Sequence, residues 1–236
     1  MVVRRGEKVK HCLYCHQAIY MKITWTNVFQ VEQRPTLCEV CEARLECIVG
    51  NRCTICSRNS EEVNCYDCER WDDYYGGQDP LLKNISMYHY NEFMKALITK
   101  WKYRGDYMIG NVFHHKFNAQ FQQHYREKHE HFIVVPIPLT EERGYERAFN
   151  QAQMLASFIQ ASKEEVLVRT LNEKQSKKTR TQRIIAENPF KLVKSLNNPV
   201  LLVDDIYTTG RTLRHAAQLL IENGCPAVYA LTICRS

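Results

Sequence analysis

The chain has 236 residues, of which 44% are hydrophobic and 25% are charged, and its formal net charge is +6. This composition excludes intrinsic disorder, and the lack of any run of about 18 apolar residues excludes a spanning helix. The basic amino terminus has no apolar segment behind it, so no secretory signal is expected. We therefore expect a cytoplasmic protein without membrane insertion, whose positive charge favours an anionic ligand or nucleic acid.

Cysteine is concentrated near the amino terminus. The chain has eleven cysteines, and eight of them form four pairs of the C-x-x-C type: Cys12 and Cys15, Cys38 and Cys41, Cys53 and Cys56, Cys65 and Cys68. One such turn places two thiolates at adjacent corners of a tetrahedron, and two turns complete a zinc site. A disulfide framework would need an oxidising compartment, which the missing secretory signal argues against.

The four pairs predict two structural Zn²⁺ sites, each closed by four cysteines and therefore without an open position for catalysis. A sequential division joins the first two pairs along the chain and then the last two, and an interleaved arrangement is the alternative. The remaining cysteines, Cys47, Cys225 and Cys234, are expected to be buried without a metal.

A segment with paired glycines and a proline at 72–80 separates the cysteine-rich part from the rest. We place a small module at 1–75 and a larger domain at 84–236. Apolar residues at helical spacing predict a helix over 90–101, and 109–127 resembles a second helix. The stretch HFIVVPIPL at 131–139 predicts a buried strand that runs into prolines, and 149–160 is expected to be helical.

The segment 171–183 is strongly basic. Five cations stand there against the single acid Glu173: Lys174, Lys177, Lys178, Arg180 and Arg183. This density suits contacts with phosphodiester groups and predicts a site for single-stranded DNA. The alternative is a solvated loop with no ligand.

The stretch VLLVDDIYTTGRT at 200–212 places two adjacent acids, Asp204 and Asp205, after four apolar residues and before a turn of small residues. Apolar spacing then predicts a helix from Leu213 to Ile221, and AVYALTI at 227–233 predicts another strand. Strands that alternate with helices imply a mainly parallel sheet covered on both faces. The expected fold class is therefore α/β.

In such folds, ligands bind beyond the carboxyl ends of the strands, where Asp204 and Asp205 are expected. The small residues of the turn let backbone amides approach an anion at the start of the helix, so a phosphate is the expected occupant. The carboxylates instead favour hydroxyl donors or a divalent cation. A sugar phosphate satisfies both demands. The structural alternative is that Asp204 pairs with a lysine and Thr208 only caps the helix.

The stretch VLLVDDIYTTGRT resembles the phosphoribosyl pyrophosphate (PRPP) signature of type I phosphoribosyltransferases. Four further features resemble the ComF family over essentially the whole chain: the paired cysteines, KYRGD at 102–106, VPIPL at 135–139 with RAFNQAQMLA at 147–156, and KQSKKTRTQR at 174–183. The resemblance implies a zinc-ribbon module ahead of a phosphoribosyltransferase-like parallel sheet. It also implies a role in DNA uptake together with the helicase-like ATPase of the ComF operon.

The same resemblance implies roles for single residues. Asp204 and Asp205 would be the catalytic acids that hold the ribose hydroxyls, and the PRPP-binding loop would comprise Thr208, Thr209, Gly210, Arg211 and Thr212. Arg143 and Arg147 would neutralise the pyrophosphate, with Mg²⁺ bridging it to the ribose. Lys102 lies in the lysine-bearing stretch of the family, and 174–183 occupies the place of the mobile hood.

Three functions fit these observations: an enzyme that transfers phosphoribose to an unknown acceptor, a binding protein that uses the PRPP site while serving transformation, and an adaptor whose site is vestigial. Intact acids and an intact loop argue against the adaptor. Because no element that recognises a base can be identified, we expect the binding protein, with the phosphoribosyltransferase as the alternative.

Overall fold

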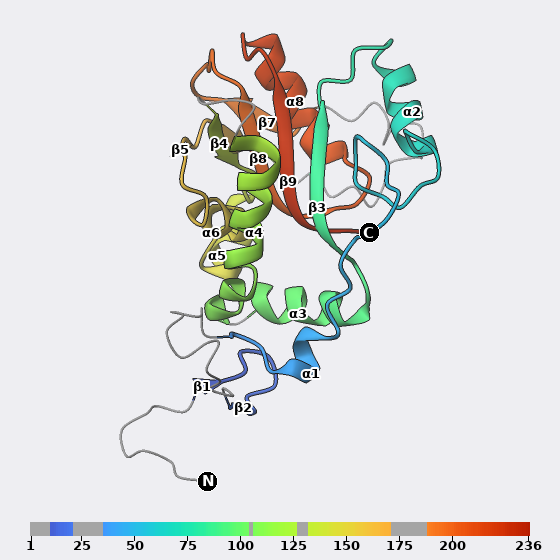
Figure 1. Cartoon of the computed structure of the whole chain (residues 1–236). Coiled ribbons are helices and arrows are strands. Elements are labelled where there is room, and N and C mark those ends of the chain that lie inside the picture. The colour runs from blue at the N-terminus through green and yellow to red at the C-terminus, as the bar shows by residue number, and fades with distance from the viewer. Residues whose placement is uncertain (1–9, 21–34, 104–105, 127–131, 171–187) are drawn as a thin grey trace, which may run out of the picture.

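The computed structural model describes residues 10–20, 35–103, 106–126, 132–170 and 188–236, and it folds them around one central sheet (Figure 1). The sheet has the strand order β3-β9-β8-β4-β5, and every neighbouring pair in it is parallel. Its strands are β3 (Lys83–His89), β4 (Ile133–Pro136), β5 (Ser162–Lys163), β8 (Val200–Tyr207) and β9 (Val228–Arg235). The predicted α/β fold with a parallel sheet is confirmed.

Both faces of this sheet are buried, because alternate residues of a strand point to opposite faces. Val200 and Leu202 of β8 belong to one core, and Leu201 and Val203 belong to the other. The first core is covered by α8 (Arg211–Glu222) and by the antiparallel pair β6 (Leu167–Arg169) and β7 (Phe190–Leu192). This double burial explains why β8 begins as an unbroken apolar run.

The second face is covered by helices that follow β3 and β4 in the chain. They are α3 (Glu92–Lys102), α4 (His114–Phe121) and most of α6 (Gln151–Ser157). The predicted helix at 90–101 is α3, with Asn91 as its N-cap. The single helix expected at 109–127 is instead three short helical segments. They are a 3₁₀ segment η1 (Tyr107–Val112), the α-helix α4 and a π-helical segment η2 (Gln122–Arg126).

Several elements were not predicted from the sequence, among them β3 and α5. Strand β3 carries the polar residues Asn84 and Ser86, which are buried and hydrogen-bonded to each other and to Thr232 of β9. Their partners lie about 150 positions away in the chain, so no local pattern marks them as buried. The second element is α5 (Glu141–Arg147), which begins at the N-cap Thr140 and ends at Ala148 in the left-handed region.

The cysteine-rich residues contact two separate parts of this domain (Figure 1). The hairpin of β1 (Lys10–His11) and β2 (Ala18–Ile19), together with α1 (Glu39–Glu42), packs on Phe93 of α3. The segment that precedes α2 (Tyr66–Tyr74) lies along the edge strand β3. There, the backbone N–H of Asn84 donates to the Ile55 carbonyl over 2.6 Å. The cysteine-rich residues therefore extend the sheet domain at two places.

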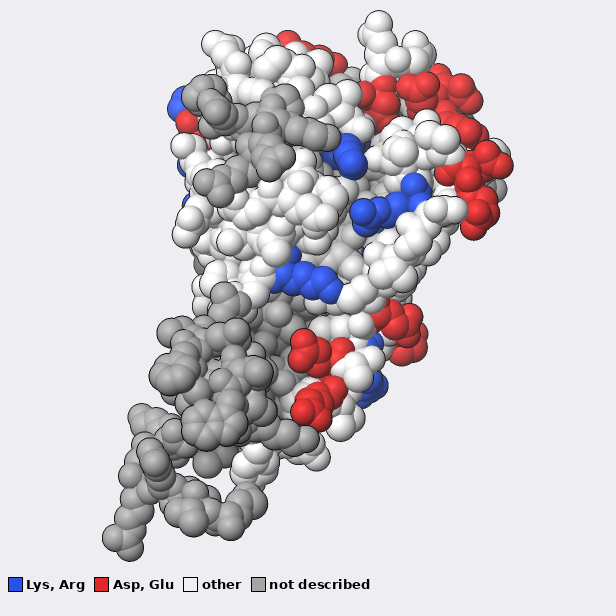
Figure 2. All heavy atoms as spheres, viewed as in Figure 1, with Lys and Arg blue, Asp and Glu red and all other residues white. Residues whose placement is uncertain are grey.

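Charge is unevenly distributed over the surface. Acidic side chains gather in the region of α2, which contains Asp67, Glu69, Asp72 and Asp73 (Figure 2). Among the described helices, none has the length and apolarity that crossing a membrane requires.

Candidate functional site

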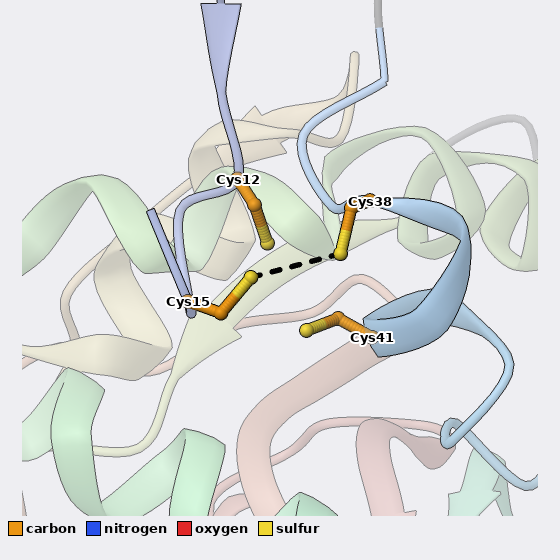
Figure 3. Close-up of side chains that lie close together, drawn as sticks. All are labelled: Cys12, Cys15, Cys38 and Cys41. Atoms are coloured by element: carbon orange, nitrogen blue, oxygen red, sulfur yellow. Dashed lines mark hydrogen bonds between the residues drawn. The ribbon is translucent and has the colours of Figure 1, made fainter. Parts of the chain in front are cut away.

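Eight cysteines form two clusters in the structure. The first cysteine cluster comprises Cys12, Cys15, Cys38 and Cys41 (Figure 3), and the second comprises Cys53, Cys56, Cys65 and Cys68. In each, all four Sγ atoms lie within 4.8 Å of one another. The structure thus has the sequential division of the pairs and not the interleaved one.

The sulfur separations suit zinc. The Sγ atoms of Cys15 and Cys38 are 3.6 Å apart, and those of Cys56 and Cys65 are 3.5 Å apart. Four thiolates at about 2.3 Å from a tetrahedral ion lie about 3.8 Å from one another. A disulfide would need about 2.05 Å, and none of the eleven cysteines is bonded to another. Both clusters are therefore compatible with structural Zn²⁺.

The two clusters have the same construction. The residue after the second cysteine, His16 or Ser57, has a positive φ of 62° or 64°, which closes the first C-x-x-C turn. The third cysteine, Cys38 or Cys65, is the N-cap of a short helix, α1 or α2. A helix amino terminus favours negative charge, so it stabilises a thiolate placed there.

The expectation that Cys47 is buried is wrong, whereas Cys225 and Cys234 are buried as expected. Cys47 lies in a bridge that pairs with Tyr88 at the outer edge of β3, and an edge position leaves its side chain exposed. Its sulfur accepts a hydrogen bond of 2.7 Å from the Lys116 ammonium.

Asp204 and Asp205 lie within β8, close to its carboxyl end. Asp205 is buried and forms an ion pair with the Lys102 ammonium at the end of α3. Asp204 is partly exposed, and its Oδ1 accepts the Asp205 backbone N–H over 2.8 Å. The structure thus brings three of the predicted PRPP-binding residues together, and the lysine pairs with Asp205 and not with Asp204.

The protonation of Asp204 depends on its surroundings. Burial raises the pKa of Asp204 to about 7, and the neighbouring charge of Asp205 acts in the same direction. A carboxyl group with this pKa takes up or releases a proton near neutral pH, and it is an acceptor for hydroxyl donors once ionised.

The 208–212 loop leads from β8 into α8. Thr208 and Thr209 are exposed, and Gly210 is buried with a φ of 78° as the N-cap of α8. A Cβ at Gly210 would overlap the Tyr207 hydroxyl and the Arg214 guanidinium, so only glycine fits here. The N-cap of α8 is Gly210 and not Thr208, and the Thr209 hydroxyl accepts the Arg211 backbone N–H over 3.4 Å.

The predicted arginines lie on α5 and at the start of α8. Arg143 is exposed on α5, and Arg147 donates to Gln151 over 3.1 Å. Arg211 begins α8, and its buried Nη2 atom has no hydrogen-bond partner among the described residues. Burial lowers the pKa of His215 to about 4, and the charges of Arg211 and Arg169 lower it further, so this histidine is neutral.

Arg169 is a candidate residue that sequence reasoning missed. It ends β6, stacks over the Phe190 ring at 5.5 Å and has no ion pair with another described residue. Burial lowers its pKa, and the charge of Arg143 lowers it further, whereas Asp204 opposes the change. Arg169 is therefore close enough to both residues to interact with them electrostatically, although 26 positions separate it from Arg143. No signal in the sequence marks a pairing of this kind.

The predicted nucleic-acid contacts, Lys174, Lys177, Lys178, Arg180 and Arg183, lie outside the described residues.

Comparison with known proteins decides the family. Over 232 residues, the chain is 39% identical to the competence protein ComFC of Bacillus subtilis, and the match covers 95% of both chains. The chain belongs to the ComFC family of competence proteins. The resemblance to the ComF family that its motifs indicated is confirmed.

More distant relatives of this ComFC-family chain also match over most of their length. Competence protein ComFC of Streptococcus pneumoniae is 28% identical, with 95% of this chain and 99% of that protein covered. The DNA utilization protein YhgH of Escherichia coli is 24% identical, with coverages of 86% and 98%. No family model matches the chain.

Among solved structures, a hypoxanthine phosphoribosyltransferase from Staphylococcus aureus overlaps this ComFC-family chain with a TM-score of 0.35 and 17% identity, over 54% of this chain and 63% of that one.

Proposed function

We propose that this chain serves DNA uptake in natural transformation, in the cytoplasm, and that it binds PRPP at the carboxyl end of β8. The role in uptake is supported by relatives that are named competence protein ComFC and DNA utilization protein. The single observation that carries the PRPP site is the position of Asp204 and Asp205, which directly precede a loop that only glycine at 210 can complete.

Each part of the ligand has a matching group. The ribose hydroxyls donate to the ionised Asp204 carboxylate and, beside Lys102, to Asp205. The 5′-phosphate accepts from the 208–212 loop at the amino end of α8. The pyrophosphate interacts with Arg143, Arg147 and the newly identified Arg169, whose charges no acid among the described residues neutralises by an ion pair. Mg²⁺ enters with the ligand and supplies charge neutralisation between pyrophosphate and carboxylates.

Two further parts of the proposal concern macromolecules and metal. The five cations of 174–183 bind single-stranded DNA through its phosphates, and the acidic region at α2 is available to a protein partner, the helicase-like ATPase. Both cysteine clusters hold Zn²⁺, and each ion joins two C-x-x-C turns within residues 1–75 to each other.

A second candidate function is phosphoribosyl transfer to an acceptor. One observation favours it: a cavity of about 330 Å³ lies against Glu141 and Gly144 of α5, the helix that carries Arg143 and Arg147, between the 138–141 turn and the residues that begin α6. Phe149 lines it and offers an aromatic ring, which suits a base-like acceptor. Catalysis there would consist of positioning the acceptor and neutralising the leaving pyrophosphate.

The PRPP site is tested by calorimetric titration of the purified protein with PRPP and Mg²⁺. We expect saturable binding that raises the melting temperature, because a ligand that binds only the folded state stabilises it. Asp204→Asn combined with Asp205→Asn should abolish both effects by removing the charged acceptors. Tyr145→Phe, on the exposed face of α5, is the matched control. A wild-type protein that shows neither heat nor a shifted melting temperature contradicts the site.

A further inference from the structure

We propose that the second cysteine cluster positions the 208–212 loop for phosphate binding, with Trp71 and Arg235 holding the loop by its carbonyl groups. This inference rests on the proposed PRPP site and identifies what gives that site its shape. It assigns the cluster a role in ligand binding in addition to folding.

The first link runs through α2. Cys68 and Trp71 lie three positions apart on this helix, so they are one turn from each other. The Trp71 indole N–H donates to the Thr209 carbonyl over 2.9 Å, across 138 positions of the chain. A metal ion bound by Cys65 and Cys68 would therefore also fix the position of Trp71, which binds the loop.

The second link runs through the carboxyl end of β9. Arg235 is buried, and its guanidinium donates to the Thr208 carbonyl over 2.6 Å. Its other amino group lies 3.9 Å from the carboxylate of Asp67, which stands between the two α2 cysteines of the cluster. Arg58 pairs with the same carboxylate over 2.8 Å. Two consecutive carbonyl groups of the loop are thus bound by Trp71 and by Arg235, and the cluster reaches them through α2 and Asp67.

The consequence for the amides follows from peptide geometry. In a trans peptide, the carbonyl of one residue and the N–H of the next point in opposite directions. Because the Thr208 carbonyl is directed toward Arg235 of β9 and the Thr209 carbonyl toward Trp71 of α2, the N–H groups of Thr209 and Gly210 are directed away from these two side chains. Two adjacent amide donors on the free side of a loop, at the amino end of α8, form an anion site.

A buried ionic network holds the same region in place. Arg214 in the first turn of α8 is fully buried and donates twice to Asp79, in the segment after α2, over 2.7 and 3.0 Å. It also donates to the Tyr207 hydroxyl over 2.7 Å and lies 5.0 Å from the Trp71 ring centre. Trp71 therefore contacts the loop and the helix that follows it.

The test uses Trp71→Phe, which keeps the ring beside Arg214 and removes the N–H donor. Tyr74→Phe is the matched control, because Tyr74 is on the same helix, packs edge-on against Trp71 and is 55% exposed. Binding of ribose 5-phosphate and of inorganic pyrophosphate is measured separately by calorimetry. Loss of one hydrogen bond should weaken ribose 5-phosphate binding about three- to tenfold in Trp71→Phe and leave pyrophosphate binding unchanged.

A second measurement needs no ligand. Amide deuterium exchange over residues 208–214 should be faster in Trp71→Phe than in wild type or Tyr74→Phe, because the loop and the bond from the Arg214 amide to the Gly210 carbonyl are less well held. The inference is overturned if Trp71→Phe weakens the binding of both ligands equally, or if its amide exchange over 208–214 is unchanged. If wild type binds neither ligand, the proposed PRPP site fails, and the exchange comparison still decides whether Trp71 positions the loop.

Discussion

Two adjacent acids with different surroundings define the site at the scale of single residues. Asp205 is buried against Lys102, and Asp204 is partly exposed with a pKa of about 7. Like charges in neighbouring positions disfavour joint ionisation, so one of them holds a proton more strongly. An isolated ligand-free pair of this kind costs stability, whereas hydroxyl donors or a cation offset that cost. This energetic cost supports a polar ligand at the pair.

This cost makes stability depend on pH. The pKa of Asp204 is about 7 in the folded protein against an ordinary 3.8, so the folded state binds more protons than the unfolded state between those values. Wild-type stability should therefore fall with rising pH in that window, by about 1.4 kcal/mol per pH unit at most. Asp204→Asn should remove this contribution, because an amide does not titrate.

Urea unfolding of wild type and Asp204→Asn from about pH 5 to about pH 8 measures the effect. The unfolding free energy of the variant minus that of wild type should increase with pH up to about pH 7 and stay constant above it. Taking the difference cancels the pH dependence of the metal clusters, which both proteins share. A difference that is constant over the whole range would contradict the raised pKa.

At the scale of elements, the chain contains one structural motif twice: a C-x-x-C turn followed by a helix that begins at a cysteine. The first copy packs on α3, and the second packs along β3 and contacts the loop before α8. A Zn²⁺ ion in each cluster would supply the cohesion that such small units lack without a large core. Loss of one ion should thus loosen only the element that its cluster holds.

Native mass spectrometry should therefore find two Zn²⁺ per chain. Cys15→Ala and Cys56→Ala should each reduce this to one, because three thiolates hold a tetrahedral ion less well than four. Both variants should melt at a lower temperature, and each should show faster deuterium exchange mainly around its own cluster. A single ion in wild type, or exchange that rises equally around both clusters in either variant, would contradict two independent sites.

At the scale of the whole molecule, acids and cations are concentrated in different segments of the chain. Exposed acids at α2 repel a DNA backbone, and the basic run at 174–183 attracts one (Figure 2 shows the acidic region). Single-stranded DNA should therefore bind at the basic run and not at α2. The small net charge of +6 conceals this separation.

Binding of single-stranded DNA should weaken with salt, with a slope of about 0.7 per neutralised phosphate on a double-logarithmic plot. Replacing Lys177, Lys178 and Arg180 with glutamine should lower that slope by about two, because a phosphate that is no longer contacted keeps its counterions. Asp72→Asn with Asp73→Asn is the control and should leave the slope unchanged. Fluorescence anisotropy over a salt series gives the slopes, and an unchanged slope in the triple variant would place the DNA site elsewhere.

Local patterns in the sequence determined several features correctly. The C-x-x-C spacing identified all eight clustered cysteines, the unbroken apolar run at 200–203 identified a doubly buried strand, and the helical spacing from Leu213 located α8. Each signal works because its cause is local: a turn brings two thiolates together, and a strand or helix repeats its burial every few residues. The α/β fold and the position of the acids near a strand end follow from these elements.

Contacts between distant segments were decided only by the tertiary structure. Burial of Asn84 and Ser86 in β3 depends on Thr232, the pairing of Asp205 depends on Lys102 of another helix, and the loop carbonyls are bound by Trp71 and Arg235. Arg169 approaches Asp204 for the same reason. None of these pairs has a spacing rule, because the sheet order and not the chain order sets which side chains meet.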